Sequence, residues 1–162
     1  MTQRGRLAPL AAGALCAIAV AGLGGAMTDT GPWYLALEKP AWQPPGWVFG
    51  PVWTVIFACC AWSFGEAWAA SRTRAARATV LWLFGFNMFL NIAWSALFFR
   101  AQRPDWALVE VALLWLSIAA LIGVLRPMSR QAAMLLLPYL AWVGLAAVLN
   151  WEVVRLNGPF GA

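Results

Sequence analysis

Tryptophan is concentrated in a proline-rich stretch, PAWQPPGWVFGPVWT, which runs from Pro40 to Thr54. Its four prolines fix φ and push the residues before them toward extended backbone, which favours a stiff loop feeding a helix. Trp42 and Trp47 flank the Pro-Pro step, and Trp53 follows Trp47 by about two helical turns. An indole ring is flat and amphipathic, so it suits a membrane interface or stacking against a planar ring system. The stretch therefore predicts a rigid segment that presents aromatic faces.

Two side-chain amides lie in the middle of an apolar run. Asn87 and Asn91 are four residues apart, and Trp94 and Ser95 continue the same helical face. An amide in hydrocarbon must find a partner, so these side chains are expected to face other helices. Two interpretations stay open: a hydrogen bond between helices, or the lining of a cavity.

A later apolar run carries a second mixed face, with Tyr139, Trp142, Ala146 and Asn150 at offsets of three, seven and eleven. Pro138 leaves one carbonyl in this run without its helical donor, which an Asn or Tyr side chain could satisfy. We expect Trp53, Trp94 and Trp142 to wall one pocket, with the Pro-Trp stretch as its cover.

Residues for metal or nucleophilic chemistry are scarce. Histidine is absent, which removes the commonest general base, metal ligand and haem ligand. Cys16 stands alone, and Cys59 and Cys60 are adjacent, so they point in different directions on a helix. We therefore interpret the cysteines as small buried hydrophobes and predict no metal site. No glycine-rich phosphate loop or nucleophile elbow is present.

Three glutamates, Glu66, Glu110 and Glu152, fall near the ends of apolar runs. Acidic residues within a membrane are candidates for ligand or proton binding. Close to an interface they can instead reach water or an arginine, and we favour anchoring for Glu110 and Glu152 while keeping a ligand or proton role open.

The elements that position these residues are membrane spans. Of 162 residues, 63% are hydrophobic and 10% are charged, and the mean hydropathy is +0.72; a soluble domain has about 25% charged residues. The apolar runs are long enough for helices to cross a bilayer and do not resemble the short segments of a barrel. The sequence thus predicts an all-α integral membrane protein, a five transmembrane helix bundle forming a single domain.

The predicted spans cover residues 7–27, 47–70, 78–99, 106–125 and 132–154. Residues 28–46 form the longest connection, carry Trp33 and Tyr34, and are predicted to be a lid over the pocket. A cleaved signal peptide with Arg4 and Arg6 is the alternative for the first run, which is longer than a typical signal core.

Basic residues are distributed unevenly across this topology. The N-terminal side has 7 of them and the other side has 4, which together account for all 11. This bias predicts a cytoplasmic N-terminus if the host is a bacterium with the protein in its inner membrane. The net charge of +5 is then a topology signal, and no patch favours nucleic acid.

Three strings carry a family resemblance: WQPPGWVFGPVWT from Trp42, NIAWSALFF from Asn91, and PYLAWVGLAAVLNWEVVRLN from Pro138. They resemble the signature regions of the TspO/translocator protein family, the tryptophan-rich sensory proteins also called peripheral benzodiazepine receptors. The resemblance runs from about Pro32 to Asn157, and the first span is its least distinctive part.

The resemblance implies a five-helix fold with a ligand pocket under the first loop, a homodimer, and a multi-pass location in a bacterial envelope or the mitochondrial outer membrane. It implies binding of porphyrins such as protoporphyrin IX, other haem-pathway tetrapyrroles, sterols and synthetic ligands. Trp53 and Trp142 match two tryptophans proposed to support light-dependent porphyrin breakdown. Asn91 and Trp94 match the N-x-A-W motif, and Ala146 matches a pocket alanine. Trp151 stands where animal members place a tyrosine, which puts sterol binding in doubt.

Taken together, residues and resemblance predict a membrane receptor or sensor that binds a planar hydrophobic ligand, a porphyrin, and uses no cofactor. The alternatives are a light-dependent porphyrin-degrading enzyme, with Trp53 and Trp142 as catalytic residues, a transporter of small hydrophobic ligands, and a scaffold for a partner protein. The predicted ligand-binding residues are Trp33, Tyr34, Trp42, Trp47, Phe49, Trp53, Phe57, Asn87, Asn91, Trp94, Tyr139, Trp142, Ala146 and Asn150.

Overall fold

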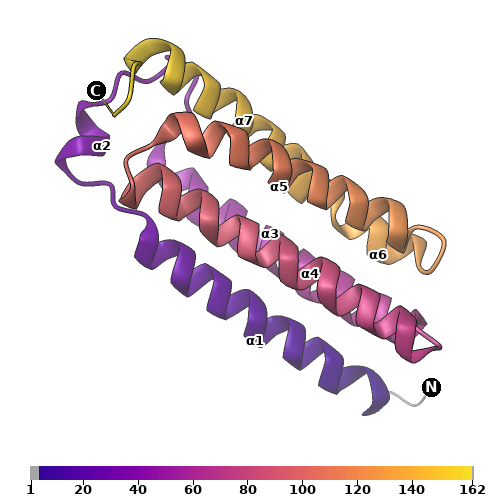
Figure 1. Cartoon of the computed structure of the whole chain (residues 1–162). Coiled ribbons are helices and arrows are strands. Elements are labelled where there is room, and N and C mark those ends of the chain that lie inside the picture. The colour runs from indigo at the N-terminus through magenta and orange to yellow at the C-terminus, as the bar shows by residue number, and fades with distance from the viewer. Residues whose placement is uncertain (1–3, 162) are drawn as a thin grey trace.

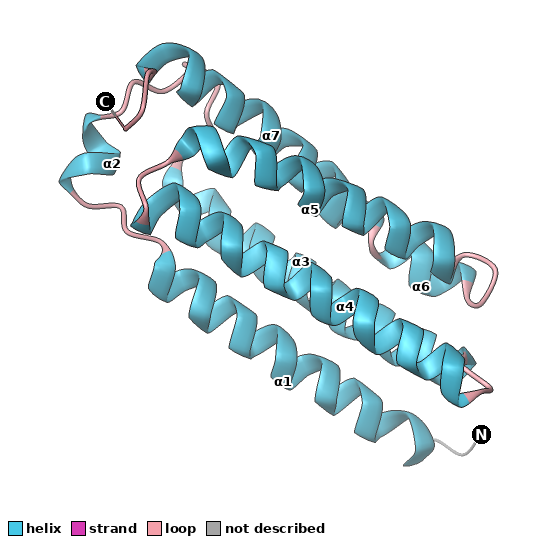
Figure 2. Ribbon diagram, viewed as in Figure 1, coloured by secondary structure: helices cyan, strands magenta, loops and turns pink. Residues whose placement is uncertain are grey.

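The computed structural model describes residues 4–161, with side chains described from residue 10 onward. Throughout that range the chain folds into helices and forms no strand (Figures 1 and 2). The helices in chain order are α1 (Arg4–Met27), α2 (Pro32–Ala36), α3 (Gly46–Ala70), α4 (Arg74–Ser95), the π-helical turn η1 (Ala96–Arg100), α5 (Pro104–Leu125), α6 (Arg130–Leu135) and α7 (Leu137–Asn157).

Within the described residues, 5 helical segments are long and apolar enough to cross a membrane. They are α1, α3, α4 with η1, α5, and α6 with α7, so the predicted all-α five-span bundle is confirmed. The chain is a multi-pass integral membrane protein. Figure 1 places the two ends of the chain at opposite ends of the bundle, as an odd number of spans requires.

Several helix ends follow from local sequence. Thr73 caps the start of α4 by accepting a hydrogen bond from the Ala76 amide at 3.1 Å, and Ser129 caps α6 in the same way at 3.2 Å. Pro104 opens α5 in the first turn, where its missing amide proton costs little. These caps hold the short turns between spans.

The fifth span differs from the continuous helix predicted for residues 132–154. It is divided at Leu136 into α6 and α7, and Pro138 lies in the first turn of α7. A proline has no amide proton to donate to the carbonyl four residues earlier, so a continuous helix would leave that carbonyl without its donor, which a new helix start at this point avoids. The third span also ends differently, because its last turn widens into η1.

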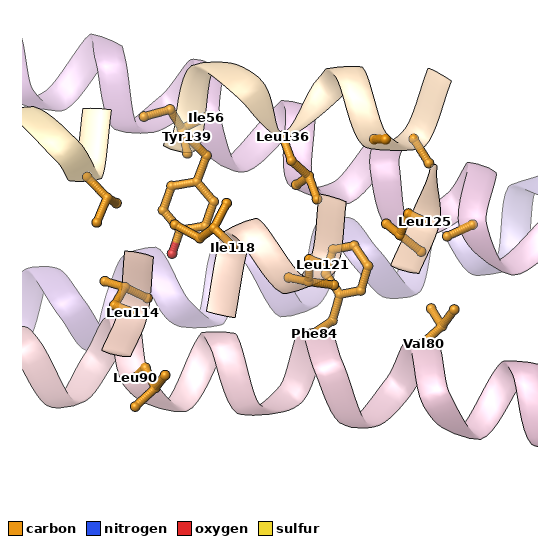
Figure 3. Close-up of a cluster of buried hydrophobic side chains, with 14 of the residues drawn as sticks. Ile56, Val80, Phe84, Leu90, Leu114, Ile118, Leu121, Leu125, Leu136 and Tyr139 are labelled. Atoms are coloured by element: carbon orange, nitrogen blue, oxygen red, sulfur yellow. The ribbon is translucent and has the colours of Figure 1, made fainter. Parts of the chain in front are cut away.

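The buried core is made by α3 to α7. Ile56, Phe84, Leu114 and Tyr139 belong to one cluster of buried side chains that point toward one another (Figure 3). The described part of α1 contributes no residue to this cluster. It lies alongside α3 and α4 at the edge of the bundle (Figure 1).

The connection between α1 and α3 folds over one end of the bundle. The Trp33 ring lies 6.1 Å from Phe98, and the Tyr34 ring lies 5.5 Å from Phe99. Asn157 bonds both the amide and the carbonyl of Glu38, at 2.8 Å each. The connection is therefore fastened to η1 and to the last turn of α7.

Candidate ligand cavity

A cavity of about 800 Å³, the main cavity, lies between α1 and the core helices. Its outer wall is α1, and aromatic side chains of α3 and α4 form the sides. Val111, Leu114, Val143 and Ala146 reach it from α5 and α7. Ligand pockets of drug-sized molecules span about 300–1,000 Å³ and are mostly apolar, as this one is.

Two tryptophans face this cavity, and each is held by a neighbour. The Trp53 ring stacks on Phe57 with 5.2 Å between ring centroids and an interplanar angle of 26°. The Trp94 ring stacks on Phe98 at 5.2 Å and 30°. Each indole also contacts a second aromatic ring at a steep angle, Tyr139 for Trp53 and Phe99 for Trp94.

The Trp94 indole is also fixed by a hydrogen bond that crosses the bundle. Its Nε1–H donates to Asn150 Oδ1 at 3.1 Å, and Asn150 Nδ2 donates to the Pro104 carbonyl at 2.8 Å. Asn150 is 1% exposed, so both bonds lie in the interior. Since the indole's only donor is occupied, Trp94 offers its ring rather than its N–H to the cavity.

Small residues of α1 leave space in front of the aromatic walls. Ala17, Ala21 and Gly25 line the cavity, each four residues after the last. Gly13 begins the same row but packs on α3, where an added Cβ would lie 3.0 Å from the Ala61 carbonyl oxygen. Small residues at a spacing of four are typical of close helix packing, and this row packs closely at Gly13 but borders open space further along the helix.

The two amides of α4 satisfy both interpretations offered for them. Asn91 Nδ2 donates to the Tyr139 hydroxyl at 3.0 Å, and Asn87 Nδ2 donates to Ser117 Oγ at 2.8 Å. Asn91 also lines the main cavity. Both amides border a second cavity of about 330 Å³, together with Tyr139 and Phe57.

A basic residue lies beside the outer end of α1. Arg100 Nη2 donates to the Ala26 carbonyl at 2.8 Å, which ties η1 to the last turn of α1. Thr28 lies two residues after Ala26, and Phe99 directly precedes Arg100; both line the main cavity. The guanidinium therefore stands close to one end of the cavity and retains donors for a ligand carboxylate.

Six of the predicted ligand-binding residues line the main cavity together: Phe49, Trp53, Phe57, Asn91, Trp94 and Ala146. Asn87 and Tyr139 line the second cavity instead. Asn150 lies behind Trp94 as its hydrogen-bond partner. Trp33 and Tyr34 lie in the fastened connection, and Tyr34 packs on the cavity residue Phe99.

The prediction that Trp142 shares a cavity wall with Trp53 and Trp94 is wrong. Trp142 lines an outer groove between α3 and α7 with Pro51, Val55 and Leu145, and its ring contacts Phe49 edge-on at 5.5 Å. Phe49 therefore separates Trp142 from the main cavity. Trp42 and Trp47 are 47% and 77% exposed, and neither lines that cavity.

Sequence reasoning did not identify the contribution of α1 to the cavity. The residues of α1 involved are Ala14, Ala17, Ile18, Val20, Ala21, Gly22, Gly24 and Gly25, and Thr28 follows directly after the helix. Their one signal is the row of small residues at a spacing of four, which by itself does not distinguish a packed face from a cavity wall.

The acidic residues have different surroundings. Glu152 forms an ion pair with Arg155 at 2.7 Å, consistent with anchoring near the helix end. Glu110 is 7% exposed and neither of its carboxyl oxygens has a hydrogen-bond partner among the described residues. The described residues also contain no group of three or more His, Cys, Asp or Glu side chains that could hold a metal ion.

Comparison with known proteins places this arrangement in a family. The TspO/MBR family profile matches residues 12–156. The chain belongs to the TspO/MBR family. Relatives include the tryptophan-rich protein TspO of Chlorobaculum tepidum, 37% identical over 77% of this chain and 79% of the relative. The human translocator protein is 38% identical over 77% and 75%, and a tryptophan-rich sensory protein of Cereibacter sphaeroides is 33% identical over 82% of each chain.

Membership in the TspO/MBR family confirms the resemblance drawn from the three sequence strings. The match begins at residue 12, within α1, and therefore includes the helix that forms the cavity's outer wall.

Proposed function

We propose that this TspO/MBR protein is a membrane receptor or sensor that binds a porphyrin, such as protoporphyrin IX, in the main cavity. The observation that carries the proposal is the pairing of Trp53 and Trp94 around one apolar cavity of about 800 Å³. A porphyrin is flat and apolar across its ring, and stacking on an indole contributes about 1 kcal/mol per well-placed ring.

The polar groups of a porphyrin lie at one edge, and the cavity has a matching asymmetry. Its lining is mostly apolar, and Arg100 bonds the Ala26 carbonyl near the end where Thr28 and Phe99 lie. An arginine can bind a carboxylate through two parallel N–H donors. A metal-free porphyrin fits better than haem, because the chain has no histidine to ligate iron.

A titration with protoporphyrin IX in detergent tests this proposal. Bound porphyrin lies against Trp53 and Trp94, so we expect saturable quenching of tryptophan fluorescence. Replacing both residues by phenylalanine removes the two tryptophans that line the cavity and should reduce the quenching, while porphyrin fluorescence still reports binding. Quenching that increases linearly without saturation would exclude a defined site.

Light-dependent degradation is the second candidate function and makes a separate prediction. Trp53 borders the cavity, whereas Trp142 lies behind Phe49. If the bound porphyrin is degraded through Trp53, illumination should bleach its Soret band in the wild type and more slowly in Trp53→Phe. Unchanged absorbance under illumination would leave binding as the function.

A further inference from the structure

The second cavity, of about 330 Å³, lies in the half of the bundle nearer the start of α1. It is bordered by α1, α3, α4 and α7 and shares Ala17, Val20, Phe57, Ala61 and Asn91 with the main cavity. Its volume is at the lower end of the range for ligand sites, and less than half that of the main cavity. A macrocycle suited to the main cavity is therefore too large for it.

Polar atoms are concentrated on one wall of this second cavity. Asn87, Asn91 and Tyr139 are 5%, 8% and 2% exposed, and all three line the cavity. The hydrogen bonds that Asn87 and Asn91 donate use one N–H of each amide. An amide carries two N–H donors and a carbonyl acceptor, so this wall can bond a hydroxyl or carbonyl oxygen as well.

The other walls are apolar and reach the membrane face of the protein. Ala12 and Cys16 of α1 and Leu81 and Gly85 of α4 line the cavity and are exposed along their helices. Residues exposed in the middle of a span face acyl chains. A Cβ added at Gly85 would meet nothing within 4 Å. The second cavity thus opens toward lipid between α1 and α4.

We propose that the second cavity is a separate binding site for a small aliphatic molecule that carries one hydroxyl or carbonyl oxygen and enters from the membrane between α1 and α4. The oxygen bonds the Asn87–Asn91–Tyr139 wall, and the aliphatic part fills the space toward Leu81 and Cys16. Its occupant is a different molecule from the porphyrin proposed for the main cavity, although Phe57 and Asn91 line both cavities.

Photolabelling with a diazirine derivative of octanol tests this site in the full-length protein in detergent. Mass spectrometry should find adducts on lining residues such as Cys16, Leu81 and Met88. Unlabelled 1-octanol should compete up to about tenfold better than n-octane, because one hydrogen bond is worth roughly 0.5–1.5 kcal/mol. Equal competition by the two compounds, or adducts spread evenly over the membrane face, would overturn the proposal.

A variant that narrows the opening between α1 and α4 is a second test of the site. Gly85→Leu places a side chain in the entrance and should remove most of the labelling. Gly123→Leu is the matched control, since Gly123 is also exposed and has no neighbour within 4 Å of an added Cβ. Labelling of Gly85→Leu at the wild-type level would contradict the proposed entrance between α1 and α4. Protoporphyrin quenching, measured in the same samples, reports the main cavity separately.

Discussion

At the scale of single residues, hydrogen-bonding capacity inside the bundle is used unevenly. Asn150 accepts from Trp94 and donates to the Pro104 carbonyl. Glu110, on the neighbouring helix, is buried with no partner for either carboxyl oxygen among the described residues. A buried polar group without a partner costs about 1–3 kcal/mol, whereas a paired one contributes to stability. Replacing Asn150 and replacing Glu110 are therefore expected to change the free energy of unfolding in opposite directions.

Asn150→Leu should lower the free energy of unfolding by about 1–3 kcal/mol, because it leaves the Trp94 N–H and the Pro104 carbonyl unpaired. Denaturant titration in mixed micelles measures the change. Trp94→Phe removes the indole donor together with part of the ring, but leaves the bond from Asn150 to the Pro104 carbonyl in place, and serves as the comparison. An unchanged unfolding free energy in Asn150→Leu would mean that these two bonds are not formed.

Glu110→Leu should raise the free energy of unfolding by about 1 kcal/mol, because it removes a buried carboxyl group without partners. The same micelle titration applies. Destabilisation of this variant would indicate instead that Glu110 is bonded in the native protein, through water or a bound molecule.

At the scale of helices, α1 combines close packing with an open wall. Gly13 approaches the α3 backbone so closely that a methyl group would lie 3.0 Å from the Ala61 oxygen. Further along α1, a methyl group at Gly22 would meet nothing within 4 Å. The helix is therefore held against α3 near Gly13, while its outer part borders the main cavity and is tied to η1 by Arg100.

Gly13→Ala should destabilise the protein by about 1–3 kcal/mol, since the clash is with backbone atoms that cannot rotate away. Gly22→Ala, on the same helix, should be neutral or stabilising by up to about 1 kcal/mol because alanine favours helix. Thermal unfolding of the two variants in detergent compares them directly. Equal melting temperatures would contradict the close approach of α1 and α3.

The positions of the helices along the chain could be predicted better than which side of each helix faces the interior. The lengths of the apolar runs determine the spans, and Pro138 marks the point where the fifth span divides. The buried side of each helix is harder to predict, because a helix that meets lipid on one side and apolar neighbours on the other shows no strong periodicity of hydrophobic residues. Trp142 illustrates the difficulty: it shares a helical face with Tyr139 and Ala146 in the sequence pattern but lines the outer groove.

The site was predictable to the extent that polar residues marked it. Asn91 and Trp94 could be placed inside because an amide in hydrocarbon needs a partner. The walls formed by Ala17, Ala21 and Gly25 carry no comparable signal, since small residues also favour tight helix packing. The five-residue helix α2 was missed because so short an element has no hydrophobic period.

At the scale of the whole molecule, the basic residues predict an orientation. The side holding the N-terminus has 7 of the 11 arginines and lysines, and the side of the α1–α3 connection has 4. In a bacterial inner membrane, positively charged loops stay in the cytoplasm, so the connection should face outward.

Single cysteines test this orientation in a variant whose native cysteines are replaced by alanine. Ala41→Cys, in the connection, should react with a membrane-impermeant maleimide in intact cells expressing the protein. Arg72→Cys, in the loop between α3 and α4, should react only after lysis. Both positions are exposed, so a reversed pattern would contradict the predicted orientation and would not reflect burial.

The central claim, that the main cavity holds the porphyrin, is tested most directly by filling one cavity at a time and measuring protoporphyrin IX affinity from the shift of its Soret band. Ala146 of α7 lines the main cavity, and Ala141 lines the outer groove beside Trp142. We expect Ala146→Phe to weaken binding by roughly 5-fold to 150-fold, since an overpacked site costs roughly 1–3 kcal/mol, while Ala141→Phe leaves it unchanged. Weakening by Ala141→Phe alone would place the ligand in the outer groove and contradict the account.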